Sequence, residues 1–328
     1  MLASLQNSLS ESGLTRRSLI LSSAFTAAAL SAYKAAAAPS STTRSDVTYH
    51  TVEADGVEVF YRKAGPADAP ALLLLHGFAN SSHYFRQLMP RLADKFCLIA
   101  PDLPSFGFTV VPAARKYDYT FASLSNTIKA FVDALQLKKY ALYVFDYGGP
   151  VGFNLALSYP DRVTAIISQN GNAYVEGLGE AWGPARALWK DPSEANRNAI
   201  RPVLTFEGVR KAYLHGVPNP LAVAPEAYWL DAALLARPGN DEIQIGLKYD
   251  YRYNIERYPL YQDYFRKNKP TTLAIWGKND PFFIPPGAET FRRDIPDAQV
   301  HLLDTGHFAL ETNLDDIAAA IRQMPIRT

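Results

Sequence analysis

Short, continuous apolar runs constrain the fold more than any other feature of this chain. They occupy residues 71–75, 96–100, 140–145 and 163–168, and the pattern returns at residues 271–276 and 299–303. Each of the first four runs is too short for a helix, and strands that are apolar on both faces are typical of buried parallel sheets. Residues 119–137 carry apolar side chains close to a 3.6-residue period, which predicts a crossover helix. Strands that alternate with helices in this way predict an α/β fold.

Two other segments complete the predicted organisation. Residues 47–62 alternate apolar and polar side chains around Asp55-Gly56, which predicts an antiparallel hairpin whose two strands lie at the edge of the sheet. Residues 172–258 are dense in Pro, Tyr and Trp and contain no buried-strand run, so we predict an inserted helical cap. The core is then divided into residues 46–171 and 259–328, and it closes with a helix over residues 314–322.

The first 45 residues differ from everything after them. They are rich in Ala, Ser and Thr, and a pair of arginines, Arg16-Arg17, precedes a mildly apolar stretch at residues 19–33 and four small residues at 35–38. This pattern resembles a twin-arginine export signal with a linker, which predicts a periplasmic or secreted protein. A disordered or amphipathic terminus with a chance arginine pair is the alternative. No other segment approaches the ~20 apolar residues of a membrane span, so no stable span is expected once the signal is removed.

Composition excludes several kinds of partner and site. Lys plus Arg, 33 in all, nearly balance the 32 Asp plus Glu, so no global field favours nucleic acid. Cys97 is the only cysteine and lies in an apolar run, which excludes an internal disulfide and a cysteine-based metal cluster. The six histidines show no paired ligand spacing, so neither a metal nor a cofactor is predicted. The expected partners are a small neutral organic substrate and water, and the oligomeric state is left open.

One apolar run ends in the form of a nucleophile elbow. Residues 140–145 are followed by Asp146-Tyr147-Gly148-Gly149 and then by the start of a predicted helix. Such a strand-to-helix turn admits only small residues near it and holds one side chain above the sheet. Here that side chain is a carboxylate, and no Gly-x-Ser-x-Gly occurs in the chain. If Asp146 were only a helix cap, the motifs described next would have no explanation.

Five segments follow one another in a recognisable order. They are His76-Gly77-Phe78, residues 102–109, Asp146-Tyr147-Gly148-Gly149-Pro150, Trp276-Gly277-Lys278-Asn279-Asp280-Pro281 and Asp304-Thr305-Gly306-His307-Phe308. In these motifs the chain resembles the α/β-hydrolase superfamily, in its epoxide hydrolase and haloalkane dehalogenase branch. The resemblance covers residues 46–328. It implies a mostly parallel eight-stranded sheet flanked by helices, with an inserted helical cap.

The motif residues carry a defined chemistry. A carboxylate such as Asp146 can attack an sp³ carbon and form an alkyl-enzyme ester. We predict that His307 activates the water that hydrolyses this ester. Asp280 is expected to orient the imidazole and to stabilise its cation. The backbone N–H groups of Phe78 and Tyr147 are expected to form the oxyanion hole.

Neighbouring polar residues have other expected roles. Asp304 is a rival to Asp280, but an acid three residues before the histidine on the same turn has poor geometry. His76 is expected to brace the oxyanion turn through a hydrogen bond. Asp102 is expected to fix its own loop.

The leaving group separates the two resembled enzymes, and halide is the first possibility. Haloalkane dehalogenases typically hold halide with the indole N–H of a Trp directly after the nucleophile. This chain has Tyr147 there, whose hydroxyl can still donate a hydrogen bond. Trp182, Trp189 or Trp229 of the cap could supply a donor instead.

An epoxide is the second possibility, and the sequence favours it. Epoxide hydrolases commonly carry His-Gly-Phe-Pro, which this chain follows through Phe78 but not at Ala79. They also use two cap tyrosines to protonate the opening oxygen. Tyr228 is the candidate here, with aromatic packing between cap and core as its alternative. The other cap tyrosines with the same standing are Tyr174, Tyr249, Tyr251 and Tyr253. A noncatalytic ligand-binding protein of the same fold is the alternative of another class.

Overall fold

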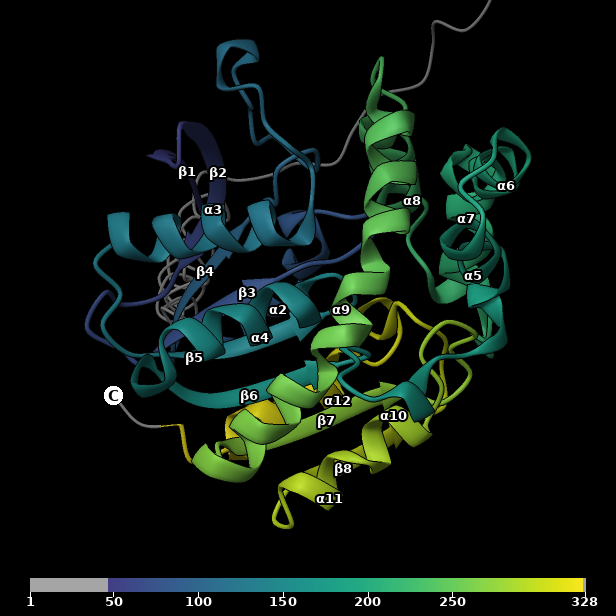
Figure 1. The fold of residues 1–328 in the computed structure, drawn as a ribbon. Helices are drawn as coiled ribbons and strands as arrows, with labels where there is room; N and C mark the ends of the chain where they lie inside the picture. Colours follow the sequence, from purple (N-terminus) through teal and green to yellow (C-terminus); the bar gives the residue numbers. More distant parts are fainter. Residues whose placement is uncertain (1–46, 327–328) are drawn as a thin grey trace, which may run out of the picture. The chain divides into compact units, whose positions relative to one another are not determined.

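The computed structural model describes residues 47–326, and its strands form one eight-stranded sheet in the order β1-β2-β4-β3-β5-β6-β7-β8 (Figure 1). The strands are β1 Thr48–Ala54, β2 Val57–Ala64, β3 Ala71–Leu75, β4 Cys97–Pro101, β5 Tyr140–Phe145, β6 Val163–Gln169, β7 Thr271–Gly277 and β8 Gln299–Leu303. β2 pairs antiparallel with both β1 and β4, and every other pairing is parallel. The predicted mostly parallel α/β sheet is confirmed.

The hairpin of β1 and β2 turns where the sequence predicts. Asp55 and Gly56 have φ of 56° and 71°, and positive φ at both central positions matches the right-handed twist of the flanking strands. The expectation that both strands lie at the edge is wrong for β2. Its last residues, 61–64, pair with β4, so only β1 is an edge strand of this hairpin. β2 is interior because its second half hydrogen-bonds to β4 on the side opposite β1.

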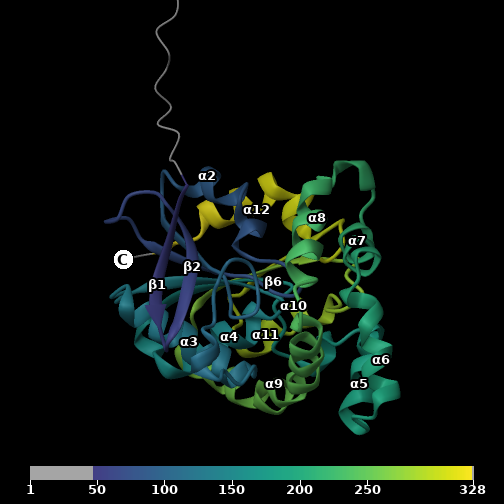
Figure 2. The same cartoon turned by 90° about the horizontal axis from the view of Figure 1, so that it is seen from above.

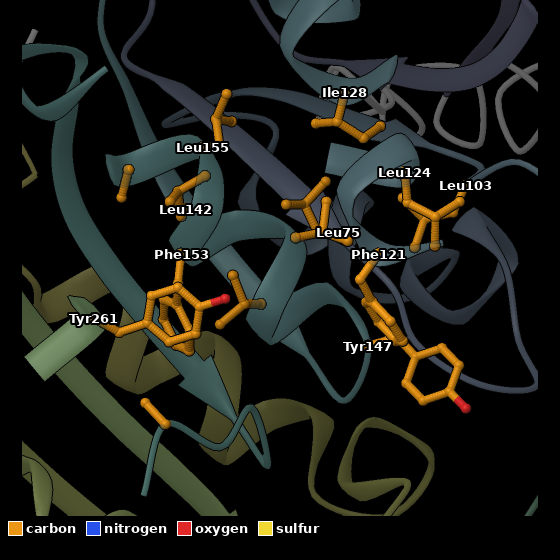
Figure 3. Packing of buried hydrophobic residues seen from close by; sticks show 14 of the residues in the cluster. Leu75, Leu103, Phe121, Leu124, Ile128, Leu142, Tyr147, Phe153, Leu155 and Tyr261 are labelled. Atoms are coloured by element: carbon orange, nitrogen blue, oxygen red, sulfur yellow. The ribbon is translucent and has the colours of Figure 1, made fainter. Parts of the chain in front are cut away.

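Helices cover both faces of the sheet (Figures 1 and 2). One face packs against α3 Phe121–Ala134, α4 Gly148–Ser158 and the second half of α9 Asn240–Asn268, and the other packs against α2 Leu88–Leu92 and α12 Leu314–Gln323. Within β3, Leu73 and Leu75 enter the first of these cores (Figure 3), whereas Leu72 and Leu74 enter the second. This alternation explains why the strand is apolar throughout.

Helices also occupy the inserted segment between β6 and β7. They are α5 Gly183–Lys190, α6 Glu194–Ile200, α7 Phe206–Leu214, α8 Pro225–Leu235 and the first half of α9. In both views α5, α6 and α7 lie together at one end of the sheet. The predicted end of the cap at residue 258 falls inside α9, next to Pro259, because the helix runs on without a break from cap to core. By their contacts, the described residues of cap and core fall within one compact unit.

Two other expectations concern export and the membrane. The predicted export signal and linker, residues 1–45, lie outside the residues that the structure describes. Over residues 47–326 no helix combines the length and the apolar character needed to cross a membrane. Cys97 is a buried free cysteine, as expected from its apolar run.

Candidate active site

Asp146 stands on a strained turn between β5 and α4. Its φ is 48°, in the left-handed region that residues other than glycine rarely adopt. Gly148 allows the turn, because a Cβ there would lie 2.2 Å from the carbonyl oxygen of Leu75. Backbone strain of this kind gathers at functional sites, where the surrounding structure holds it in place. The elbow predicted from the sequence is therefore present.

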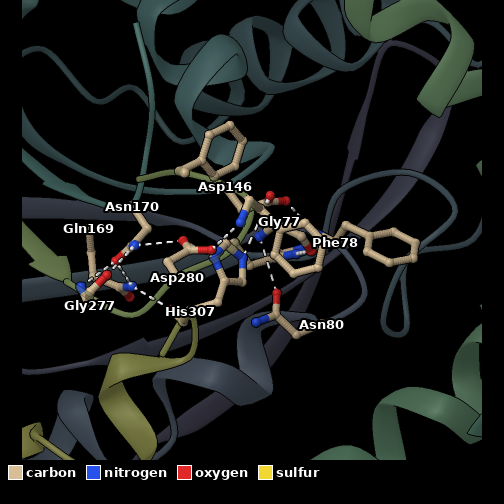
Figure 4. Close-up of polar contacts among 12 residues, drawn as sticks. Gly77, Phe78, Asn80, Asp146, Gln169, Asn170, Gly277, Asp280 and His307 are labelled. Carbon is tan, nitrogen blue, oxygen red and sulfur yellow. Dashed lines mark hydrogen bonds and ion pairs between the residues drawn. The ribbon is translucent and has the colours of Figure 1, made fainter. Parts of the chain in front are cut away.

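Backbone donors hold one oxygen of the Asp146 carboxylate (Figure 4). The N–H of Phe78 donates to Oδ1 at 2.7 Å, and the backbone N–H of Tyr147 acts with it to lower the pKa of the carboxyl group. The residue is only 5% exposed. Burial raises the pKa of Asp146, and this effect exceeds the opposing effects of His307, Lys248 and the two backbone donors. Oδ1 thus accepts from one of the two backbone donors predicted to form an oxyanion hole, and that role stays a prediction.

His307, on the turn after β8, lies between two carboxylates (Figure 4). Its Nδ1 is 2.6 Å from Oδ2 of Asp280, and its Nε2 is 3.7 Å from Oδ2 of Asp146. Burial lowers the pKa of His307, but the negative charges of Asp280 and Asp146 outweigh burial and leave this pKa raised. The structure therefore brings together the three residues predicted as nucleophile, base and acid. Their catalytic role stays a prediction.

Asp280 is held by donors that sequence reasoning missed. The side-chain amide of Asn170 donates to Oδ2 at 2.7 Å, and the backbone N–H of Phe282 donates to Oδ1 at 2.7 Å. The side-chain amide of Gln169 donates to the carbonyl oxygen of His307 at 3.0 Å. A signal was available, because two amide residues directly end the apolar run of β6 at the carboxyl edge of the sheet.

Asp304, the rival acid, lies elsewhere. Its side chain is 64% exposed, and its Oδ1 accepts from the Asn279 amide at 3.0 Å and pairs with the Lys278 ammonium at 3.3 Å. Both partners belong to the turn after β7. The carboxylate that contacts the imidazole of His307 is therefore that of Asp280, and its role as the catalytic acid stays a prediction.

His76 and Asp102 have the structural roles expected of them. Nε2 of His76 accepts from the backbone N–H of Leu103 at 2.9 Å, so Nδ1 carries the proton and donates to the carbonyl of Gly77 at 3.0 Å. Burial lowers the pKa of His76, which keeps the ring neutral. Asp102 accepts from the backbone N–H of Phe108 at 2.7 Å within its own loop, and from the backbone N–H of Ser82 at 2.6 Å in the segment after β3.

A cavity of about 540 Å³ lies in front of Asp146 and His307. This size suits a small organic molecule, and the walls are mostly apolar. The cap residues that line it are Ala181, Trp182, Ile200, Pro202, Val203, Thr205, Glu207, Gly208, Val209, Lys211, Ala212, His215 and Lys248. Over residues 47–326 no group of three or more His, Cys, Asp or Glu side chains could hold a metal ion.

The cap tryptophans offer no free N–H to a leaving group. Trp182 lines the cavity, but its indole N–H donates to the carbonyl of Phe282 at 3.1 Å. The indole N–H of Trp189 donates to the backbone carbonyl of Lys248 at 2.8 Å, and Trp229 is 59% exposed. Neither Trp189 nor Trp229 lines the cavity. The predicted role of Trp182 and Trp189 as halide donors is therefore corrected, because the fold uses both N–H groups to fix the cap.

The tyrosines named from the sequence are also placed elsewhere. Tyr228 packs between Phe206 and Tyr213, with ring centroids 6.1 Å from each, so its role is aromatic packing, here within the cap rather than between cap and core. The hydroxyl of Tyr251 lies 3.3 Å from another tyrosine hydroxyl. The Tyr147 hydroxyl is buried without a hydrogen-bond partner. None of the residues that line the cavity is a tyrosine, so the expectation of a leaving-group donor at Tyr228 is corrected.

One charged residue at the cavity was missed from the sequence. Lys248 of α9 is half-buried, and its Nζ lies 4.8 Å, 5.1 Å and 4.7 Å from the ring centroids of Phe78, Tyr147 and Trp182. Among the described residues Nζ has no hydrogen-bond or ion-pair partner. Burial lowers the pKa of Lys248 to about 8, although the charge of Asp146 opposes this effect.

Comparison with known proteins places this site in a family. A model described as the alpha/beta hydrolase fold matches residues 70–314. The chain belongs to the α/β-hydrolase family. A relative named an uncharacterized hydrolase, from Saccharomyces cerevisiae, is 45% identical over 282 residues, which cover 84% of this chain and 96% of the relative. The cis-3-alkyl-4-alkyloxetan-2-one decarboxylase of Shewanella oneidensis is 27% identical over 296 residues, which cover 85% of this α/β-hydrolase and 88% of the relative.

Solved structures agree with the family. An epoxide hydrolase, CorEH, has a TM-score of 0.71 at 19% identity, covering 86% of this chain and 100% of its own. The haloalkane dehalogenase DbeA of Bradyrhizobium elkani has a TM-score of 0.68 at 21% identity, covering 84% and 96%. At such identities the likeness shows the fold. The family match and the yeast relative make this α/β-hydrolase an enzyme.

Proposed function

We propose that this enzyme opens an epoxide with the carboxylate of Asp146 and hydrolyses the resulting ester. The observation that carries the proposal is the different setting of the two carboxylate oxygens. Oδ1 accepts the N–H of Phe78, whereas Oδ2 lies at the cavity, 3.7 Å from Nε2 of His307. Oδ2 is the oxygen that attacks the ring carbon, because it has no backbone donor competing for its lone pairs. Oδ1 takes the negative charge that develops when the ester is hydrolysed.

The second step uses the imidazole of His307. A water molecule beside Nε2 loses its proton to the ring and attacks the ester carbonyl carbon of Asp146. Asp280 stabilises the imidazolium that forms, through the 2.6 Å contact with Nδ1. The same imidazolium then protonates the departing alkoxide oxygen, and the product is a diol.

The choice of an epoxide over a haloalkane rests on the indole N–H groups of the cap and on the residue that follows His-Gly. Halide is held by N–H groups in the resembled dehalogenases, but here the indole N–H of Trp182 is bonded to Phe282. Phe78 follows His-Gly, as it does in the resembled epoxide hydrolases. Release of halide is the second candidate, favoured by the structural likeness to a haloalkane dehalogenase. Parallel assays of diol formation from styrene oxide and of iodide release from butyl iodide separate the two.

The nucleophile is tested by isotope transfer. In a single turnover of styrene oxide in water enriched in oxygen-18, the heavy isotope is expected in the carboxylate of Asp146 and not in the diol. His307→Gln should accumulate an ester on the peptide that contains Asp146, while His307→Gln combined with Asp146→Asn should form none. Heavy oxygen in the diol after one turnover, with an unlabelled peptide, would show direct attack by water and overturn the proposal.

We also propose, from the sequence alone, that residues 1–45 direct export through the twin-arginine route. The pair Arg16-Arg17 before a mildly apolar stretch supports this. Fractionation of a bacterial host should find the full chain in the periplasm or medium. Replacing both arginines by lysine should retain it in the cytoplasm, and equal export of the two forms would contradict the proposal.

A further inference from the structure

The proposed ring opening needs an acid that the preceding residues do not supply. When the carbon–oxygen bond of an epoxide breaks, the electron pair stays on an oxygen that would become a poorly stabilised alkoxide. No tyrosine lines the cavity, and the N–H of Trp182 is already bonded. The cationic side chains that line it are Lys211, His215 and Lys248, besides His307. In the proposed mechanism His307 must be neutral to act as the base of ester hydrolysis, so it is not the acid of ring opening.

Solvent exposure distinguishes Lys248 from Lys211 and His215. Lys211 and His215 are exposed, so water competes with a substrate for their hydrogen bonds. Lys248 is half-buried, and its Nζ lies above the ring of Phe78, the residue whose backbone N–H holds Asp146. The ammonium and the nucleophile thus both contact Phe78 and both line the cavity, and their charges interact.

The described residues around Lys248 accept no hydrogen bond from its ammonium group. The faces of Phe78, Tyr147 and Trp182 lie within 5.1 Å of Nζ, and aromatic faces attract a cation without accepting its protons as a carboxylate would. No described residue accepts a hydrogen bond from Nζ. An ammonium that is desolvated and unpaired beside a nucleophile can donate to a substrate oxygen that enters the cavity.

We propose that Lys248 is the acid that protonates the leaving oxygen when Asp146 opens an epoxide. This inference rests on the proposed function and extends it, because it assigns a residue of the cap to the leaving group. The substrate class that follows is a neutral, apolar epoxide whose oxygen points toward α9 while a ring carbon faces Oδ2 of Asp146.

Ring opening transfers one proton from Lys248 to the substrate. Oδ2 of Asp146 forms a bond to the ring carbon, the carbon–oxygen bond breaks, and its electron pair takes a proton from Nζ to give a hydroxyl and a neutral amine. A water molecule then gives a proton to His307 and attacks the ester carbonyl carbon with its oxygen. The released alkoxide takes the proton of the imidazolium. Asp146 is left as a carboxylic acid, and its proton returns through solvent to Lys248. The net reaction is epoxide plus water to diol.

The acidity of Lys248 suits this role. Burial lowers its pKa to about 8, so the group is protonated at neutral pH and gives its proton up more readily than an exposed lysine. The titratable and charged groups that face it across the cavity are Asp146 and His307 of the core and Glu207, Lys211 and His215 of the cap. Asp146 acts against the shift, and burial is its main cause.

The test isolates ring opening from ester hydrolysis. In full-length His307→Gln protein, the rate at which styrene oxide labels Asp146 is followed by mass spectrometry between pH 6 and 10. We expect this rate to fall as pH rises through about 8. Adding Lys248→Met should lower the rate at neutral pH by about 10²-fold and remove the pH dependence. Adding Lys248→Arg should retain more activity but also remove the fall, since a guanidinium keeps its charge throughout this range.

A matched control and two distinct failures complete the design. Lys267→Met changes an exposed lysine near the end of the same helix and should leave both rate and pH dependence unchanged. Thermal unfolding of each variant shows that it is folded. If styrene oxide fails to label Asp146 even with Lys248 intact, the proposed function is overturned. If labelling occurs at the same rate and with the same pH dependence in the Lys248→Met protein, the nucleophile stands and the role of Lys248 is refuted.

Discussion

Replacing Asp280 by Asn probes the hydrolytic half of the proposed mechanism. Asp280 accepts from His307, Asn170 and the backbone of Phe282. An asparagine side chain has one acceptor oxygen and one NH₂ group in place of the two carboxylate oxygens. Its NH₂ group must therefore face either the N–H of Phe282 or the donors of His307 and Asn170, and it cannot accept a hydrogen bond from them. The substituted side chain therefore loses both the charge and part of its hydrogen bonding. Ring opening does not use the imidazole, so we expect it to proceed.

The charge sets the size of the effect. Nδ1 of His307 lies 2.6 Å from Oδ2 of Asp280, which places the centres of the two charges about 4 Å apart. At an effective dielectric constant of about 20, two such charges attract by about 4 kcal/mol, and 1.36 kcal/mol corresponds to a factor of ten in rate. Ester hydrolysis in Asp280→Asn should therefore slow by about 10³-fold.

The assay is a burst measurement with styrene oxide. Because ring opening continues while hydrolysis slows, Asp280→Asn should accumulate about one equivalent of ester on Asp146, whereas the wild type should accumulate little. The residual hydrolysis should also extend to lower pH. In the wild type the raised pKa of His307 costs activity as pH falls through it. Without Asp280, burial and the charge of Lys248 still lower that pKa, and the charge of Asp146, which opposes them, is removed in the ester. The exposed rival Asp304→Asn is the control. Equal damage from both substitutions, or rapid hydrolysis without Asp280, would refute the reasoning.

Three further outcomes follow from the same contacts. Gly148→Ala should shift the elbow, because the new Cβ would lie 2.2 Å from a backbone oxygen, and a loss of about 1–3 kcal/mol in the free energy of unfolding should accompany a loss of diol formation. Tyr228→Phe should change diol formation by less than about twofold, because its ring packs inside the cap and a substitution of this kind costs about 0.5 kcal/mol or less. The pH–rate profile of diol formation by the wild type should be bell-shaped. The rate should fall at low pH as His307 becomes charged, and above about 8 as Lys248 loses its proton. A flat profile would contradict both assignments.

The core could be predicted because its constraints are local. A strand buried on both faces must be apolar throughout, and the observed bounds of β3 and β5 are the apolar runs themselves. The crossover helix shortens from the predicted residues 119–137 to Phe121–Ala134, because the Thr120 hydroxyl accepts from the N–H of Ser123 and starts the helix there. The place of β2 in the sheet was missed because pairing with β4 is a long-range event that alternation alone does not report.

In the candidate site, too, the residues on the sheet could be predicted from the sequence, whereas those in the cap could not. Asp146, Asp280 and His307 each follow a strand at the carboxyl edge of the sheet, so strand order alone brings them together. Tyr228 and Lys248 lie in the cap, where aromatic residues are buried from several directions and periodicity does not say which side faces the cavity. A signal for Lys248 did exist, since it follows a buried glutamine by four residues and precedes a buried tyrosine by three, on one face of α9.

Core and cap thus control different bonds of the proposed reaction. The bond to the nucleophile and its hydrolysis depend on turns of the sheet, which the elbow, Asp280 and His307 hold in place. The leaving oxygen depends on α9, which presents Lys248 from the other side of Phe78. Because α9 begins in the cap and continues against the core, a change in cap packing can move the acid while the nucleophile stays on its turn. Leaving-group preference is therefore the property that substitutions in the cap should alter first, with the triad geometry unchanged.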